Sequence, residues 1–208
     1  MTITHKSLAA AVILTATALC CLSVKARTVE EAFTSMPNHL VPMLTSNMRL
    51  DMVDYYRAGS SRPTRNVLYD SSRVVYADDS RMEVALSPLS RMELALVPVK
   101  KDTLLAVIET VSTPAEDSFV NFYTSDWQHV AGPLQPLAAD FALTPSAPVL
   151  PQFFVSATYV PGSCEFVFTN TTSDSVMVRL APEVYGAYGA ERRYRFDGRK
   201  LVPTDGRK

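Results

Sequence analysis

Paired acidic residues are the groups in this sequence best suited to catalysis. Asp78 and Asp79 are adjacent, Glu116 and Asp117 are adjacent, and Asp126 follows shortly afterwards. A glycoside hydrolase needs two carboxyl groups held several ångströms apart, so such residues are worth testing as an active site. All of them fall where turns are expected, and aspartate favours turns because it hydrogen-bonds the local backbone. We therefore expect structural roles for these residues.

Patterns that would indicate other chemistry are missing from the sequence. His39 and His129 are the histidines beyond residue 26, and no Cys-x-x-Cys or His-Glu-x-x-His spacing offers a transition-metal site. No Gly-x-Ser-x-Gly segment singles out a serine nucleophile. Gly186-Ala187-Tyr188-Gly189 lacks the spacing of a phosphate-binding loop. The sequence thus predicts no catalytic residue, no metal site and no cofactor.

Aromatic residues are better candidates for binding than for catalysis. Trp127 is the only tryptophan and follows Asp126 at a predicted turn, where an indole ring could stack on a sugar or anchor a protein. Tyr185 and Tyr188 precede a C-terminal segment, residues 191–208, that is rich in basic residues. We expect an interaction surface that includes these four residues. The alternative for Trp127 is that its ring closes the core at the end of a strand pair.

The first 26 residues predict export. Lys6 precedes an uncharged apolar stretch from Leu8 to Leu22, and Val24-Lys25-Ala26 has small residues at the positions that a signal peptidase requires. Neither Cys20 nor Cys21 follows a small residue, so a lipid anchor is not expected. We expect a signal peptide over residues 1–26 and a periplasmic or extracellular protein, with a retained membrane anchor as the alternative. Export argues against a nucleic-acid partner.

Removal of the predicted signal peptide would leave Cys164 as the single thiol, so no internal disulfide could form. The run Cys164-Glu165-Phe166-Val167-Phe168 favours a strand. We expect Cys164 to be a buried, inert thiol rather than a nucleophile.

Two short helices are predicted near the start of the exported part. Thr28 and Glu31 have the spacing of a capping box, which predicts a helix over Thr28–Phe33 that ends before Pro37. Apolar residues at helical spacing predict a second helix over residues 47–56. Its methionines, Met48 and Met52, should pack against a sheet, and its polar face should contain Arg49, Asp51, Asp54 and Arg57.

The sequence beyond Gly59 alternates between apolar and polar residues. Two nearly identical decapeptides, residues 80–89 and 90–99, predict consecutive antiparallel strands. One face of this pair should contain Met82, Val84, Leu86, Met92, Leu94 and Leu96. Further strands are expected over residues 73–77, 103–111, 119–124, 127–130, 153–160, 165–169 and 176–180. A last hairpin is expected over residues 194–202, with a two-residue turn at Asp197-Gly198.

These elements predict an α+β fold with two short N-terminal helices packed on a curved antiparallel meander sheet, and a second strand-rich half after a proline-rich connection. We expect residues 27–208 to form one domain. It could consist of two subdomains, residues 27–131 and 152–208, joined by residues 132–151, in which residues 137–143 could form a short helix. The repeated order of helix and strands leaves an internal duplication open.

Three segments resemble a known family: residues 28–37, residues 48–54, and residues 109–127 with Asp117–Tyr123 and Asp126-Trp127. They are similar to secreted proteins of unknown function from gut and oral bacteria of the Bacteroidales type. The resemblance covers nearly all of the chain beyond residue 26. It implies an α+β architecture and a Gram-negative envelope location, and it assigns no active site.

These observations favour a non-enzymatic, exported envelope protein that binds a protein or polymer partner through the face or edge of its sheet. The first alternative is a periplasmic, carboxylate-dependent hydrolase of glycan or peptide. The second is a carrier of a small apolar ligand, which the methionine-rich face suggests. Carboxylates that converge in one concave pocket would favour hydrolysis. An exposed apolar patch or an unpaired strand edge would favour binding.

Overall fold

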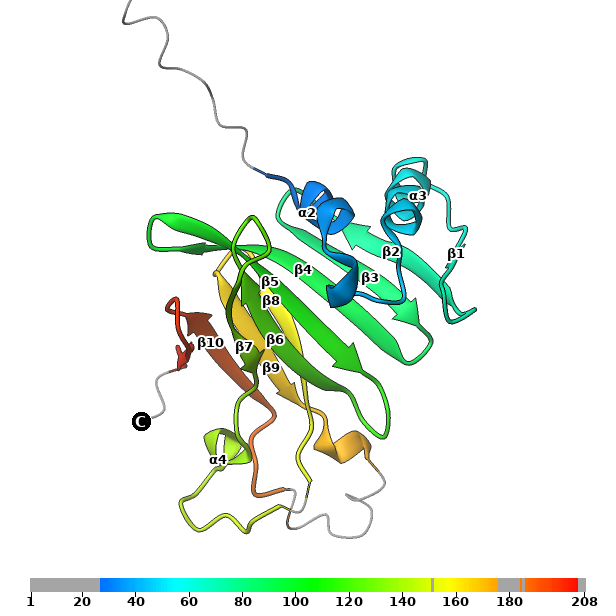
Figure 1. The fold of residues 1–208 in the computed structure, drawn as a ribbon. Coiled ribbons are helices and arrows are strands. Elements are labelled where there is room, and N and C mark those ends of the chain that lie inside the picture. The colour runs from blue at the N-terminus through cyan, green and yellow to red at the C-terminus, as the bar shows by residue number, and fades with distance from the viewer. Residues whose placement is uncertain (1–26, 151, 176–183, 185, 206–208) are drawn as a thin grey trace, which may run out of the picture.

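The structure is a computed structural model that describes residues 27–150, 152–175, 184 and 186–205. It consists mainly of antiparallel strands in two sheets, with a few short helices, so the predicted α+β class is confirmed (Figure 1). The strand predicted over residues 176–180 lies outside the described residues. Within the described part of the chain, no helix has the length and apolar character needed to cross a bilayer.

The first described helix, α2, spans Val29–Ser35 and begins with the predicted capping box. Thr28 Oγ1 accepts a hydrogen bond from Glu31 N (3.2 Å), and the Glu31 carboxylate accepts one from Thr28 N (3.0 Å). The helix ends before Pro37, as predicted, and is followed by the 3₁₀ helix η2, Asn38–Leu40.

Helix α3 spans Ser46–Arg57, close to the predicted range, and Thr45 caps its start. The prediction that Arg49 lies on the polar face is wrong, because its side chain is only 1% exposed. Its guanidinium donates to Leu44 O (2.7 Å), to Asn38 Oδ1 (3.1 Å) and to Met36 O. Arg49 is buried because it satisfies the backbone of the segment that joins α2 to α3.

The larger sheet is a meander in which seven strands lie side by side in chain order, each antiparallel to the next. The two decapeptides form neighbouring strands, with Met82 opposite Leu94 and Val84 opposite Met92. β7 begins two residues later than the predicted strand at 127–130, because Trp127 lies in a turn with φ 63°. The strands are β1 Thr64–Arg65, β2 Ser71–Ala77, β3 Arg81–Ser87, β4 Ser90–Val99, β5 Asp102–Val111, β6 Asp117–Tyr123 and β7 His129–Leu134.

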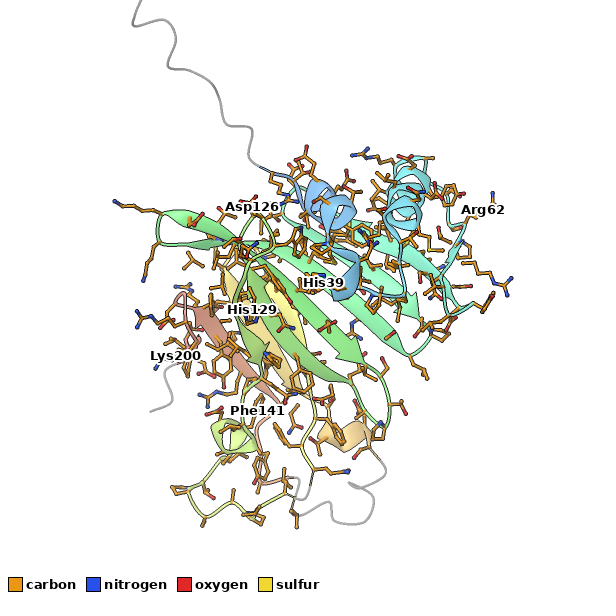
Figure 2. All side chains as sticks on the ribbon, viewed as in Figure 1. His39, Arg62, Asp126, His129, Phe141 and Lys200 are labelled. Carbon is orange, nitrogen blue, oxygen red and sulfur yellow. The ribbon has the colours of Figure 1, made fainter. Side chains whose placement is uncertain are left out.

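The smaller sheet has the order β11-β10-β9-β8 and packs on the face of the meander opposite α2 and α3 (Figure 1). Aromatic rings fill this contact: Phe122 stacks on Phe196 and meets Phe166 edge to face. Helix α4, Ala138–Phe141, is shorter than predicted and places Phe141 in the same core (Figure 2). The strands are β8 Val155–Val160, β9 Glu165–Asn170, β10 Glu191–Phe196 and β11 Leu201–Pro203.

The last hairpin has a longer loop than predicted. Phe196 pairs with Leu201, so four residues separate the strands rather than two. Asp197 Oδ1 accepts hydrogen bonds from Arg199 N (2.8 Å) and Lys200 N (3.0 Å), and Gly198 takes a positive φ of 101°. The aspartate therefore organises the loop through its side chain instead of occupying a left-handed position of a two-residue turn.

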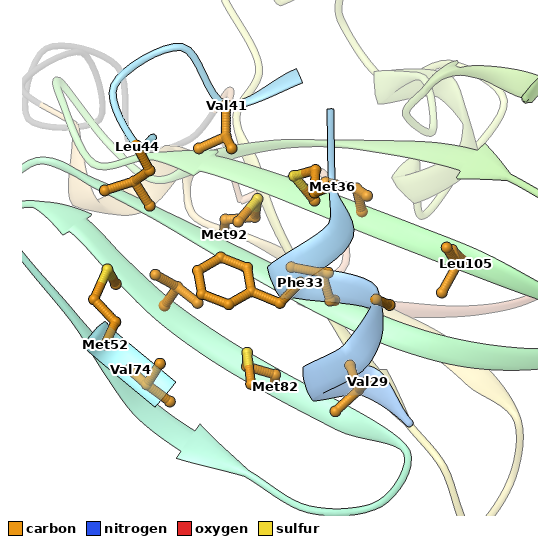
Figure 3. Close-up of a cluster of buried hydrophobic side chains, with 14 of the residues drawn as sticks. Val29, Phe33, Met36, Val41, Leu44, Met52, Val74, Met82, Met92 and Leu105 are labelled. Atoms are coloured by element: carbon orange, nitrogen blue, oxygen red, sulfur yellow. The ribbon is translucent and has the colours of Figure 1, made fainter. Parts of the chain in front are cut away.

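A second core lies between the helices and the meander (Figure 3). Phe33 of α2 lies among apolar side chains of the sheet and of α3, and all of the predicted inward-facing residues of the decapeptides belong to this core or pack against it. The methionines Met52, Met82 and Met92 are at most 2% exposed. The methionine-rich face that suggested an apolar-ligand carrier is thus filled by the protein's own side chains.

Candidate interaction surface

The acidic residues considered for catalysis lie at three separate turns. Asp78 belongs to the β2–β3 turn and Asp126 to the β6–β7 turn, whereas Glu116 and Asp117 lie at the β5–β6 turn. In a meander the β5–β6 turn lies at the opposite end of the strands from the other two. The fold therefore separates Glu116 and Asp117 from the remaining acidic residues instead of gathering them in one pocket.

Three of these carboxylates have structural partners. Both terminal nitrogens of Arg91 donate to Glu116, and this hydrogen bonding lowers the pKa of the Glu116 carboxyl. Burial raises the pKa of Asp78, but hydrogen bonds from Tyr76 Oη and from the backbone of the following turn outweigh that effect, so its pKa is lowered. Burial raises the pKa of Asp117, which accepts hydrogen bonds from Gln135 and from Val155 N. Hydrogen bonding accounts for the lowered pKa values of Glu116 and Asp78, and burial accounts for the raised pKa of Asp117, so none of the shifts requires a catalytic role.

The Trp127 ring packs against the core between the helices and the meander, with its centroid 5.6 Å from that of Tyr123. Its Nε1 is buried and has no hydrogen-bond partner among the described residues. Asp126 beside it is exposed to solvent. Asp126 is thus the accessible member of this predicted pair, whereas the Trp127 indole packs mainly against the core.

The second predicted pair is only partly described. Tyr185 lies outside the described residues. Tyr188 is half-buried, meets the Phe153 ring at 5.8 Å between centroids and donates a hydrogen bond to Pro148 O. Gly189 N donates to Phe141 O, which places Tyr188 beside α4, at the opposite end of the molecule from Asp126 (Figure 2). The structure does not bring Asp126 and Trp127 together with Tyr188.

Cys164 is not a buried strand residue, contrary to the sequence prediction. It lies in the turn before β9, has a positive φ of 54° and is half-buried. The tight β8–β9 connection explains this position, because Cys164 N donates to Pro161 O to close the turn. Among the described residues no group of three or more His, Cys, Asp or Glu side chains is arranged to hold a metal ion.

A pocket of about 470 Å³ opens beside the Asp126 corner. Its walls combine the charged residues Arg27, Lys101 and Asp102 with Leu96 and Leu105. Because charges of both signs line it and it is open to solvent, the pocket does not resemble the enclosed apolar cavity of a ligand carrier.

The outer edge of β2 is the clearest unpaired backbone in the described part of the chain. β1 pairs only with Ser71 and Ser72, and Tyr56 Oη accepts a hydrogen bond from Ala77 N (3.0 Å) at the other end. Between these ends, Arg73 to Tyr76 have no strand on their outer side among the described residues. Because Ser72 pairs with Thr64, the main-chain groups of Val74, two residues on, also face outward.

The surface around this edge is partly apolar. A bulge in β2 between Val74 and Tyr76 leaves the consecutive residues Val75 and Tyr76 exposed by 47% and 40%. A groove of about 300 Å³ runs beside them, between the end of α3 and the strand, and is lined by Tyr56, Gly59, Ser60, Ser61, Arg73, Val74 and Val75. We call Arg73–Tyr76 with this groove the β2 edge.

The other sheet edges are less suited to accept a strand. β7 and β11 contain Pro133 and Pro203, which lack a backbone donor, and β1 has only two residues. On β8 the outward N–H groups of Ala157 and Tyr159 are already bound by side chains of the meander. The β2 edge could have been suspected from the sequence, since residues 71–77 contain no proline.

Comparison with solved structures identifies a protein with a similar fold. A solved domain of an uncharacterized protein from Porphyromonas gingivalis W83 superposes with a TM-score of 0.69, covering 85% of this chain and 98% of that chain. The two are 19% identical, so this likeness concerns the fold alone. Among curated proteins none matches the chain.

The family described as "Protein of unknown function (DUF3256)" matches residues 21–184. The match covers well over half of the 208 residues and includes all of the segments on which the predicted resemblance was based. The part of that resemblance which concerned a family of unknown function is therefore confirmed. The chain belongs to the DUF3256 family.

Proposed function

We propose that this protein is a non-enzymatic, exported envelope protein that binds an extended segment of a partner protein at the β2 edge. The observation that supports the proposal most directly is the unpaired stretch Arg73–Tyr76 beside an open groove. Residues 1–26, with the features of a signal peptide, support the export step.

An extended segment would bind by adding a strand to the meander. Main-chain hydrogen bonds to Val74 would provide affinity, and side chains at alternate positions of the ligand would contact Arg73 and Val75. The bulge limits the free edge to a few residues, which protects the sheet from open-ended pairing. A short edge of this kind suits a specific partner better than self-association.

The proposal can be tested with peptides selected from a random library on the immobilised protein. Bound peptide should protect the Val74 amide from hydrogen exchange, because that N–H becomes part of a new ladder. Val75→Arg should weaken peptide binding by roughly tenfold or more, which corresponds to about 1.4 kcal/mol. Val130→Arg, which changes an exposed valine on the edge strand β7, is the matched control and should bind as the wild type does.

Two results would contradict the proposal. Protection could appear at Trp127, at Tyr188 or along β7 instead of β2. Alternatively, the protein could hydrolyse a peptide or glycan in a reaction abolished by Asp78→Asn, which would restore the hydrolase hypothesis.

A further inference from the structure

The turn between β1 and β2 exposes three consecutive apolar residues. Val67, Leu68 and Tyr69 are exposed by 44%, 67% and 78%. They form the tip of the hairpin at the outer margin of the meander, on the opposite side of the molecule from β10 (Figure 1). We call Val67–Tyr69 the apolar tip.

The apolar tip is held in place by a buried asparagine. Asn66 is 3% exposed, and its Oδ1 accepts hydrogen bonds from Leu68 N (2.9 Å) and Asp70 N (3.1 Å). Its Nδ2 donates to Ser72 Oγ and to Leu86 O, both at 3.0 Å. Tyr69 has a φ of 64°, a conformation that costs energy for a bulky residue. The three side chains are thus fixed outward by the fold itself.

One arginine, Arg65, lies beside the tip, and a second, Arg62, lies beyond the far end of β1. The Arg65 guanidinium lies 4.7 Å from the centroid of the Tyr69 ring, and that of Arg62 lies 5.6 Å from the centroid of Tyr55. Both arginines are exposed (Arg62 is labelled in Figure 2), and neither forms an ion pair within the described part of the chain. The chain as a whole has a formal net charge of −1, so this cationic region is local.

We propose that the apolar tip docks on a membrane surface rich in anionic lipid. A bilayer offers hydrocarbon for Val67 and Leu68, an interfacial region that suits a tyrosine, and negative headgroups for Arg65 beside them. The long Arg65 side chain can follow the tip into the headgroup region while its charged end remains hydrated. The site uses residues outside the β2 edge, so it does not depend on the proposed binding of a partner strand.

A local probe is needed to test this docking, because residues 8–22 of the full chain are themselves apolar and could bind lipid. Leu68→Trp places an indole at the tip. Leu137→Trp is the matched control, since Leu137 is a similarly exposed leucine (71%) at the start of α4. The difference in emission from the wild type is measured with phosphatidylcholine vesicles that contain or lack phosphatidylglycerol.

With phosphatidylglycerol present, the emission of Leu68→Trp should move to shorter wavelength and that of Leu137→Trp should not. Adding Arg65→Gln should lower the vesicle affinity of the tip roughly fivefold, and raised salt should act in the same direction. The proposal is overturned if Leu68→Trp shows no shift, if both probes shift alike, or if the shift is equal on vesicles without anionic lipid.

Discussion

The buried guanidinium of Arg49 donates hydrogen bonds to the irregular segment that joins α2 to α3. Its guanidinium is buried, has no carboxylate partner among the described residues, and donates to Met36 O, Leu44 O and Asn38 Oδ1. Burial lowers its pKa, yet an arginine remains protonated under ordinary conditions. Helical periodicity could not reveal this role, because the acceptors lie in an irregular segment whose path the sequence does not display.

Replacing Arg49 by methionine should destabilise the protein strongly. Two buried backbone oxygens, Met36 O and Leu44 O, would lose this donor. Each unsatisfied group costs about 1–3 kcal/mol, so the free energy of unfolding should fall by about 2 kcal/mol or more. Urea denaturation measures the change. Arg57→Met is the control on the same helix: Arg57 pairs with Glu30 at the surface, where solvent screens such pairs and they contribute little to stability. Equal effects of the two substitutions would refute the role assigned to Arg49.

At the scale of elements, patterns confined to neighbouring residues predicted the structure best. The capping box at Thr28 and the strand pair formed by the two decapeptides are both present, since a helix start and a period-two alternation depend on nearby residues. The four-residue loop at Asp197 and the position of Cys164 were missed, because several turn geometries suit the same residues.

The candidate surface was less predictable than the elements. Exposure of Trp127 depends on how its ring packs against the core, and the unpaired length of β2 depends on how far β1 continues. One signal was available: Val67-Leu68-Tyr69 is an apolar run within a segment of turn-forming residues and belongs to no predicted strand. Apolar residues that fit no predicted helix or strand are thus a signal from which the exposed apolar tip could have been predicted.

The β1–β2 turn should lose its fixed shape in Asn66→Ala. The amides of Leu68 and Asp70 would lose the acceptor that orders them, so their hydrogen exchange should become faster by roughly tenfold or more. The amide of Thr172, which donates to Asn170 Oδ1 in a similar turn of the other sheet, is an internal control and should not change. If Leu68 and Asp70 kept their wild-type exchange, the asparagine would not be what holds the apolar tip.

At the scale of the whole molecule, the two sheets are joined through side chains. The outward N–H groups of β8 donate to Asp117 Oδ1 from Val155 (3.4 Å), to Ser118 Oγ from Ala157 (2.9 Å) and to Glu93 Oε1 from Tyr159 (2.9 Å). The meander thereby covers the β8 edge of the smaller sheet, which would otherwise be open to pairing with other chains. These contacts join residues 38 to 66 positions apart in the chain, so no local pattern predicts them.

Glu93 makes this junction sensitive to pH. Its carboxylate accepts hydrogen bonds from Tyr159 N and from Thr158 Oγ1, lies 3.4 Å from Arg81 Nε, and is nearly buried. Burial raises the pKa of Glu93 in spite of these partners. Between the unfolded value of about 4.3 and the raised folded value, the folded state therefore binds more protons than the unfolded state. The contribution of Glu93 to the free energy of unfolding is greatest below that window and falls as pH rises through it.

Glu93→Gln should remove this dependence, because glutamine keeps an oxygen acceptor for Tyr159 N and does not ionise. The difference in free energy of unfolding between the variant and the wild type should shift in favour of the variant as pH rises through the window, and then become constant. Urea denaturation from pH 4 to pH 8 measures it. Glu191→Gln is the control, since Glu191 is an exposed glutamate on β10. A pH-independent difference for Glu93→Gln would show that this carboxyl titrates alike in the folded and unfolded chain, and that the junction between the sheets does not respond to pH through Glu93.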